Sequence, residues 1–226
     1  MLTEPGSTPS PREYAAEAAP GAERPGVQPR VAVLDYGVGN LRNVARALRA
    51  IGADAAVALS PAQAADADRL VLPGVGAFGD SIAELRRRGF DRAVADAVAA
   101  GKPLLGICVG YQMLFEESHE FGRHAGLGLF QGRVERFPEG AQVPHVGWNE
   151  VAWGDGTAGW YYFVHSYRPV EVDAAVVLGT TDHGGTFPAA VRRDNVWGVQ
   201  FHPEKSQKAG LKLLADFLAA PVAAAR

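Results

Sequence analysis

The stretch that decides the fold is "KPLLGICVGYQMLFEES", residues 102–118, in which an apolar run leads into a Gly-X-Cys-X-Gly motif and then into a helix-like pattern. The apolar run is typical of a buried parallel strand at 102–107, and residues 111–118 are expected to form a helix. The two glycines leave room around Cys108, the only cysteine of the chain. A strand, a tight turn and a helix in this order predict a nucleophile elbow. On this stretch alone, Cys108 is either a nucleophile or a small buried thiol.

Strand-like and helix-like segments alternate in the sequence before this motif. The expected elements there are strands at 31–37, 55–60 and 69–76 and helices at 40–54 and 80–101. Asn40 is a candidate N-cap of the first helix, and the second helix is expected to break near Gly89. This alternation predicts a parallel sheet with helices on both faces.

The second half of the sequence changes character. Strand-forming residues separated by turn residues lie at 127–137, 145–153, 159–170 and 174–183, and an amphipathic pattern at 206–220 predicts a final helix. We therefore expect an α/β fold with an open mixed sheet, helices on both faces and antiparallel additions in the second half.

Composition restricts the class of protein. The chain has 226 residues, is 47% hydrophobic and carries a net charge of -3. One domain at 30–226 is expected, without the basic excess of a nucleic-acid-binding protein and without an apolar run of the roughly 20 residues that cross a membrane. Residues 1–29 are rich in Pro, Ala, Gly and Glu and are expected to be a disordered tail. They lack the pattern of a signal peptide, so the protein is expected to be cytoplasmic.

A thiol nucleophile needs a base, and six histidines are candidates. In "WGVQFHPEKS" a short apolar strand leads to His202, Pro203 stiffens the next step, and Glu204 is spaced to hydrogen-bond the far ring nitrogen. For the other five, structural or solvent-facing roles are expected; they are His119, His124, His145, His165 and His183.

Cys108 in "GICVG" together with the downstream "FHPEKS" resembles the class I glutamine amidotransferases, which remove the amide nitrogen of glutamine with a Cys-His-Glu triad. Within that family, "LDYGVGNLRNV", "LPGVGAFG", "PHVGWNEV" and "YYFVHSYR" are similar to the glutaminase subunits of imidazole glycerol phosphate synthases. The similarity covers residues 31–220 and implies a flavodoxin-like sheet. Tyr111 stands where many relatives carry Met.

The resemblance implies a role for each matching position. Cys108 is the nucleophile, His202 the base and acid, and Glu204 the group that stabilises the imidazolium. Oxyanion donors are implied at the backbone of Val75 and Val109. Contacts with the L-glutamine substrate are implied at Gly74, Gly76, Gln112, Glu120, Ser166 and Tyr167. The resemblance calls for no cofactor and no metal.

A partner is also implied, because ammonia released into water becomes ammonium and is no longer nucleophilic. The family's partner is a TIM-barrel cyclase subunit, which gives a heterodimer and produces imidazole glycerol phosphate and an aminoimidazole carboxamide ribotide. The implied contacts are Asn40, Asn43, Trp148, Tyr162 and Lys205. A phosphate-binding loop in "YGVGNL" is rejected, because the G-x-G-x-x-G pattern fails at Arg42.

Two alternatives remain open at this point. The chain could serve another synthase, as in anthranilate or pyridoxal phosphate synthesis, or it could be a non-catalytic scaffold that kept the fold. The stretches "PHVGWN" and "DYGVGN" favour the histidine-pathway subunit over the first alternative. The presence of Cys108, His202 and Glu204 argues against the second.

Overall fold

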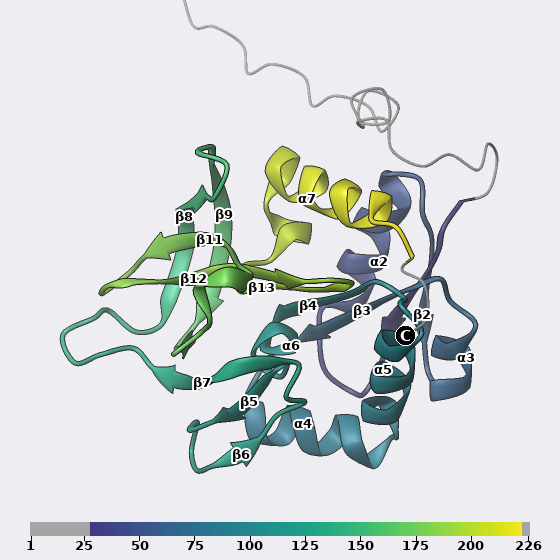
Figure 1. Cartoon of the computed structure of the whole chain (residues 1–226), viewed down its shortest axis with the longest axis horizontal. Coiled ribbons are helices and arrows are strands. Elements are labelled where there is room, and N and C mark those ends of the chain that lie inside the picture. Colours follow the sequence, from purple (N-terminus) through teal and green to yellow (C-terminus); the bar gives the residue numbers. More distant parts are fainter. Residues whose placement is uncertain (1–27, 223–226) are drawn as a thin grey trace, which may run out of the picture.

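A computed structural model describes residues 28–222 of the chain. These residues form a nine-stranded sheet and a four-stranded sheet, with helices packed around the larger one (Figure 1). The tail expected at 1–29 lies, apart from its last two residues, outside the described residues. Within 28–222, none of the helices has the length and apolar character needed to span a bilayer.

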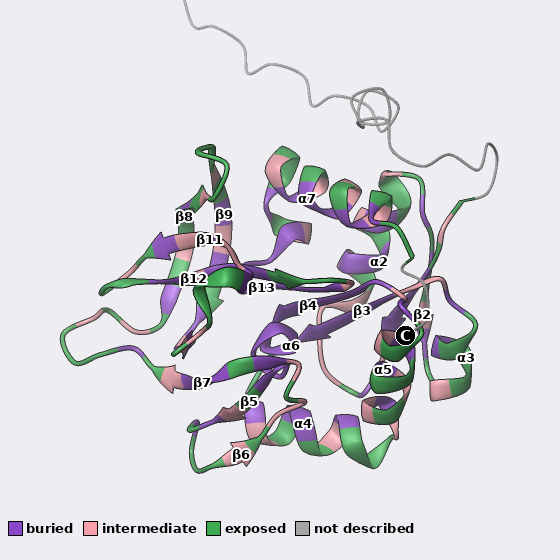
Figure 2. Cartoon of the chain, in the orientation of Figure 1, coloured by how far each residue is buried: buried purple, intermediate pink, exposed green. Residues whose placement is uncertain are grey.

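The first half of the large sheet is parallel. Its strands lie side by side in the order β2 (Asp54–Ala58), β1 (Arg30–Leu34), β3 (Arg69–Gly74), β4 (Leu104–Cys108) and β13 (Val196–Val199). When β13 is counted as the fifth parallel strand of the chain, this is the 2-1-3-4-5 order of flavodoxin-like folds. Figure 2 shows β3 and β4 in the buried colour, as expected for strands covered on both faces.

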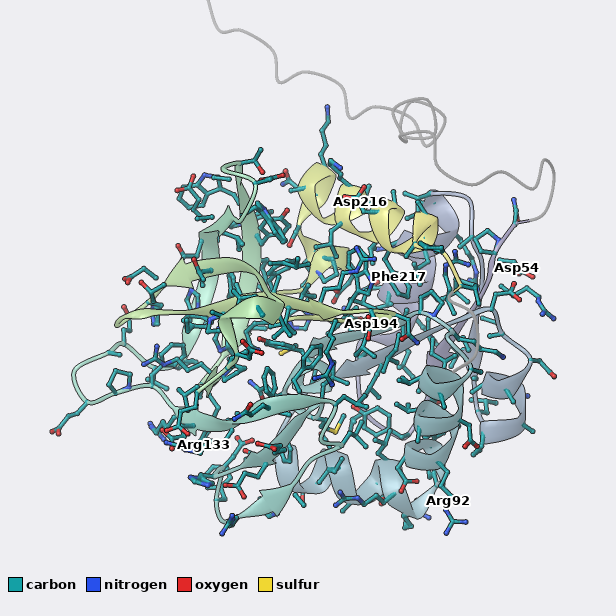
Figure 3. The ribbon with its side chains drawn as sticks, in the orientation of Figure 1. Asp54, Arg92, Arg133, Asp194, Asp216 and Phe217 are labelled. Atoms are coloured by element: carbon teal, nitrogen blue, oxygen red, sulfur yellow. The ribbon has the colours of Figure 1, made fainter. Side chains whose placement is uncertain are left out.

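Helices cover both faces of this parallel half (Figure 1). On one side lie α2 (Leu41–Ala50) and α7 (Gln207–Ala219); on the other lie α3 (Pro61–Ala65), α4 (Phe78–Arg87) and α5 (Phe90–Ala99). The Phe217 side chain of α7 fills the space beneath this helix, where its ring meets Trp197 edge-on (Figure 3).

The local signals explain two helix boundaries. The expected break at Gly89 is confirmed, since this residue takes a left-handed φ of 74° between α4 and α5. Helix α3 was not expected from the sequence. Ser60 caps it by accepting a hydrogen bond from the Gln63 N–H, and Pro61 occupies its first turn.

The second half adds antiparallel strands, as predicted. β13 is followed across the sheet by β12 (Thr186–Arg193), β11 (Val177–Asp182), β8 (His145–Trp153) and β9 (Ala158–His165), and a short helix η1 (Ala174–Val176) precedes β11. In β8 buried residues are spaced among exposed ones, so this strand has a solvent-facing side.

The helix expected at 111–118 is wrong in extent. Helix α6 (Val109–Gln112) is a single turn, and the chain then enters β5 (Phe115–Ser118). The Leu114 carbonyl accepts hydrogen bonds from the N–H groups of residues 129 and 130, at 2.8 and 3.0 Å. These long-range bonds draw the segment into the small sheet, so tertiary pairing overrides the local helical pattern. That sheet has the order β10 (Tyr167–Val170), β7 (Phe130–Arg136), β5 and β6 (His124–Ala125).

Two glycines let α6 lie directly on the large sheet. Gly106 of β4 and Gly198 of β13 are cross-strand neighbours. A Cβ at Gly198 would lie 2.3 Å from Cδ2 of Tyr111, and a Cβ at Gly106 would lie 2.8 Å from the Gly110 carbonyl oxygen. The Tyr111 ring is fully buried over this glycine floor, and its hydroxyl donates to the Pro188 carbonyl at 3.1 Å. The space for Tyr111 is therefore built into the sheet.

Candidate active site

Cys108 ends β4 in a strained backbone conformation. Its φ is 56° and its ψ is -113°, which few non-glycine residues adopt, and it is 2% exposed. A Cβ at Gly110 would lie 1.8 Å from the Leu72 carbonyl oxygen, so only glycine allows the turn to pack against β3. These features confirm the tight strand-to-helix turn expected at the Gly-X-Cys-X-Gly motif.

His202 reaches the same place from the neighbouring strand. It follows β13, which pairs in parallel with β4, so the carboxyl ends of both strands meet at one edge of the sheet. Its Nδ1 donates to Oε1 of Glu204 at 2.9 Å, and the two side chains are 3% and 0% exposed. Glu204 belongs to the short helix η2 (Pro203–Lys205).

The electrostatics of His202 favour its charged form. Burial lowers the pKa of His202, but the hydrogen bond to Glu204 and the charges that Glu204 and the neighbouring Cys108 can carry outweigh burial and raise this pKa to about 10. Within the described residues, His202 Nε2 is buried and has no hydrogen-bond partner. Glu204 thus holds Nδ1, and Nε2 is free to exchange a proton with groups in the pocket, which Cys108 also lines.

Asn40 contributes a contact that the sequence did not predict. It stands at the N-cap position of α2, but its side chain caps nothing there, so that part of the expectation is wrong. Its Nδ2 instead donates to Glu204 Oε1 at 3.3 Å. Ser206 also supports this region by donating its hydroxyl to the His202 carbonyl at 2.6 Å. The carboxylate behind His202 is therefore fixed from α2 as well.

A pocket of about 290 Å³ lies in front of Cys108 and His202. It is lined by Val75, Gly76, Cys108, Val109, Gln112, Glu120, Pro144, Val164, His165, Ser166, Tyr167 and His202. Every residue expected from the resemblance as an oxyanion donor or glutamine contact is among them except Gly74. Gly74 is buried at the end of β3, where a Cβ would lie 2.5 Å from the Gly110 nitrogen, so it packs against the turn that carries Cys108.

Two polar side chains of the pocket already have protein partners. Gln112 Nε2 donates to the Tyr167 carbonyl at 2.9 Å and to Gln200 Oε1 at 3.1 Å. Glu120 Oε2 accepts from the Phe78 N–H at 2.6 Å, and burial raises the pKa of Glu120. Gln200, whose Nε2 lies 3.9 Å from Cys108 Sγ, was missed from the sequence. Its signal was a lone amide in the apolar strand just before His202.

The residues expected at a partner interface gather beside the site. Tyr162 is half-buried, and its ring meets the ring of Trp148 edge-on at 6.2 Å and Lys205 Nζ at 5.5 Å. Trp148 is 44% exposed. By strand register the exposed Val146, Val164 and Trp160 share this face of β8 and β9. Asn40 touches Glu204, and the half-buried Asn43 lies one turn along α2.

A cysteine on a strained turn at the carboxyl edge of a flavodoxin-like sheet, beside a histidine held by a glutamate, defines the class. The chain belongs to the glutamine amidotransferase class-I family, whose model matches residues 32–220. This confirms the family resemblance and the fold class predicted from the sequence.

Within this family, the chain is most informatively compared with curated relatives that share nearly half of its residues. The chain is 49% identical to "Imidazole glycerol phosphate synthase subunit HisH" of Salinibacter ruber over 204 residues, which cover 84% of this chain and 94% of that protein. It is 50% identical to the protein of the same name from Symbiobacterium thermophilum, over 83% of this chain and 92% of the relative.

Solved structures support the fold. A crystal structure of a glutamine amidotransferase superposes with a TM-score of 0.70 at 24% identity, over 84% of this chain and 99% of that one. PurLQS from Thermotoga maritima superposes with a TM-score of 0.67 at 24% identity, over 85% and 98%. At this level of identity the similarity concerns the fold alone.

Proposed function

We propose that this chain is the glutaminase subunit of an imidazole glycerol phosphate synthase. It hydrolyses L-glutamine to glutamate and ammonia and passes the ammonia to a cyclase subunit. The observation that carries the proposal is the pocket in which Cys108 and His202 meet, with Glu204 hydrogen-bonded behind His202. The names and the identity of the curated relatives support it.

The first half of the reaction releases ammonia. His202 Nε2 takes the thiol proton as the Cys108 sulfur attacks the carboxamide carbon of glutamine. The tetrahedral intermediate then collapses, the C–N bond breaks, and the leaving nitrogen takes the proton from Nε2. Ammonia departs and a glutamyl thioester remains on Cys108. The raised pKa of His202 supports this role, because Nε2 then holds the proton taken from the thiol until the leaving nitrogen accepts it.

The second half restores the enzyme. Water loses a proton to His202 and attacks the thioester carbon; the C–S bond breaks, the sulfur regains a proton and glutamate leaves. Glu204 keeps Nδ1 protonated and stabilises each imidazolium that forms. Because both side chains are almost fully buried, this stabilisation is only weakly screened by solvent.

The pocket residues then have distinct tasks. The backbone N–H of Val109, the first residue of α6, has no acceptor within that helix and serves the oxyanion together with the loop at Val75. Glu120 meets the ammonium of the substrate. Further substrate contacts come from Gly76, Gln112, Ser166 and Tyr167.

The ammonia leaves toward a TIM-barrel cyclase that forms a heterodimer with this chain in the cytoplasm. The contacts are Asn40, Asn43, Trp148, Tyr162 and Lys205. The exposed apolar side chains of β8 and β9 support this assignment, since tryptophan and tyrosine are typical of interface cores.

The decisive experiment measures glutamate release by the chain alone and with a cyclase subunit plus its nucleotide substrate. We expect turnover in the complex and its loss in Cys108→Ala. Synthase subunits from anthranilate and pyridoxal phosphate synthesis are the controls. If one of these, and not the cyclase, stimulates glutamate release, the assignment to imidazole glycerol phosphate synthase is wrong.

A further inference from the structure

His165 lines the pocket and contacts a second histidine, His145, behind it, and the mechanism uses neither. His145 on β8 and His165 on β9 face each other across the strand pair and are 4% and 7% exposed. His145 Nδ1 lies 2.9 Å from His165 Nε2, and His165 Nδ1 lies 2.8 Å from the Tyr167 carbonyl oxygen. The two rings therefore form a chain of hydrogen bonds that ends on the backbone of the pocket.

The direction of this chain follows from the partner at its end. A carbonyl only accepts, so His165 Nδ1 must carry a proton and donate to Tyr167. In a neutral His165 the Nε2 is then an acceptor, and the proton between the rings belongs to His145 Nδ1. His145 Nε2 accepts in turn from Asn149 Nδ2 at 3.2 Å, and the same amide donates to the Asp182 carbonyl at 2.8 Å. From Asn149 through His145 and His165 to the Tyr167 carbonyl, each hydrogen bond is therefore donated in the direction of the pocket.

The surroundings keep both rings neutral. They are enclosed by the aromatic rings of Phe137, Phe163 and Phe187. Burial lowers the pKa of His145 to about 4 and that of His165 to about 3. Near neutral pH each ring therefore holds one proton, and the hydrogen bonds fix which nitrogen carries it.

The end of the chain is a corner of the fold. Ser166 is the residue between β9 and β10, where the backbone passes from the nine-stranded sheet to the four-stranded one. The bond from His165 to the Tyr167 carbonyl spans this corner, and Gln112 donates to the same carbonyl. Ser166 and Tyr167 both line the pocket.

We propose that His145 and His165 are positioning residues, which hold the backbone of Ser166 and Tyr167 where it binds the substrate. Their tautomers are fixed, and they transfer no proton during the reaction. The proposal rests on the proposed function, in which these two residues contact glutamine. Since the corner binds the ground state and the transition state alike, its loss weakens binding and leaves the chemical step intact.

Matched amide variants test this directly. The amide of Asn reaches the place of Nδ1 in a histidine ring, and the longer side chain of Gln reaches the place of Nε2. We expect His165→Gln, which loses the bond to Tyr167, to raise the KM for glutamine about tenfold, as the loss of a buried hydrogen bond of about 1.4 kcal/mol does. Its kcat should stay within about twofold. His165→Asn should keep KM within about threefold of the wild type.

The two variants control for each other, because each loses the same buried ring; thermal unfolding of both measures the loss of packing. Equal KM values for His165→Asn and His165→Gln, or a fall in kcat at constant KM, would overturn the proposal.

A second readout does not depend on activity. Nitrogen NMR of the histidine-labelled full chain should show neutral Nδ1–H tautomers for both rings at pH 7. An Nε2–H tautomer or a charged ring in either histidine would overturn the proposed direction of the hydrogen bonds and with it the positioning role. If the wild type with its cyclase released no glutamate, the proposed function would fail, and the NMR spectrum would still decide the hydrogen-bond direction.

Discussion

Gly198→Ala is expected to lower both the stability and the catalytic activity of this protein, because the added methyl group collides with Tyr111, which packs under the turn at Cys108. Its Cβ would lie 2.3 Å from Tyr111 Cδ2, more than 1 Å inside the 3.4 Å at which ordinary contact begins. Tyr111 is fully buried and tied to Pro188, so its ring has no free side to move to.

The size of the effect follows from this overlap. Extra volume in a packed core costs about 1–3 kcal/mol, and about 2 kcal/mol lowers the melting temperature of a chain of this length by about 4–8 °C. Tyr111 is the third residue after Cys108 in the same turn, so a displacement of about 1 Å at the turn moves the sulfur too. Such a misplacement lowers kcat by up to about 10²-fold.

Urea unfolding and glutamate release by the complex measure the two effects. Gly154→Ala is the matched control, since its Cβ would meet nothing closer than 3.5 Å, and it should change stability by less than about 0.5 kcal/mol. Tyr111→Met in the Gly198→Ala background should recover about 1 kcal/mol, because methionine adapts to the space. An alanine at Gly198 that leaves stability unchanged, or a loss that Tyr111→Met does not relieve, would refute the reasoning.

Three further outcomes are expected. Cys108→Ala should abolish glutamate release without loss of folding. Glu204→Ala should retain more activity, since the orientation of His202 is only part of catalysis. If Cys108→Ala kept a tenth of the wild-type activity, the assignment of Cys108 as the nucleophile would be wrong. Steady-state assays should show low glutaminase activity for the chain alone and strong activation by the nucleotide-loaded cyclase, because one misaligned oxyanion donor costs about 10²–10³ in rate; equal rates would exclude such gating. Unfolding free energies should be highest near the ordinary pKa of histidine, about 6.5. The lowered pKa values of His145 and His165 make the unfolded chain bind more protons below that pH, so stability falls by up to about 1.4 kcal/mol per pH unit for each ring. The raised pKa of His202 stabilises the fold fully below about pH 6.5, and this contribution is lost as the pH rises toward about 10. A pH profile that is flat between about pH 5 and about pH 9 would argue against both shifts.

Local patterns predicted much of this structure. Apolar runs identified β1, β3 and β4, and the glycine at position 89 marked a helix boundary, because such signals act within a few residues. The pairing of Cys108 with His202 followed from motif chemistry and resemblance.

Contacts between segments that are far apart in the chain could not be predicted from the sequence. The helix expected after Cys108 ends after one turn because residues 129 and 130 bond to Leu114. Asn40 matched a helix cap by local spacing, yet its amide bonds to Glu204, which lies 164 residues away in the sequence. His145 and His165 lie in the stretches "PHVGWNEV" and "YYFVHSYR", but only the register of β8 with β9 shows that their rings meet.

Because β4 and β13 are neighbours in the sheet but distant in the sequence, the two halves of the active site are synthesised at different times. Residues 109–195 separate these strands and build the antiparallel extension and the second sheet. During synthesis Cys108 therefore emerges from the ribosome well before His202, and it has no base until β13 inserts between β4 and β12. A nascent chain, or one that terminates before His202, therefore lacks the base of the triad and is expected not to consume glutamine.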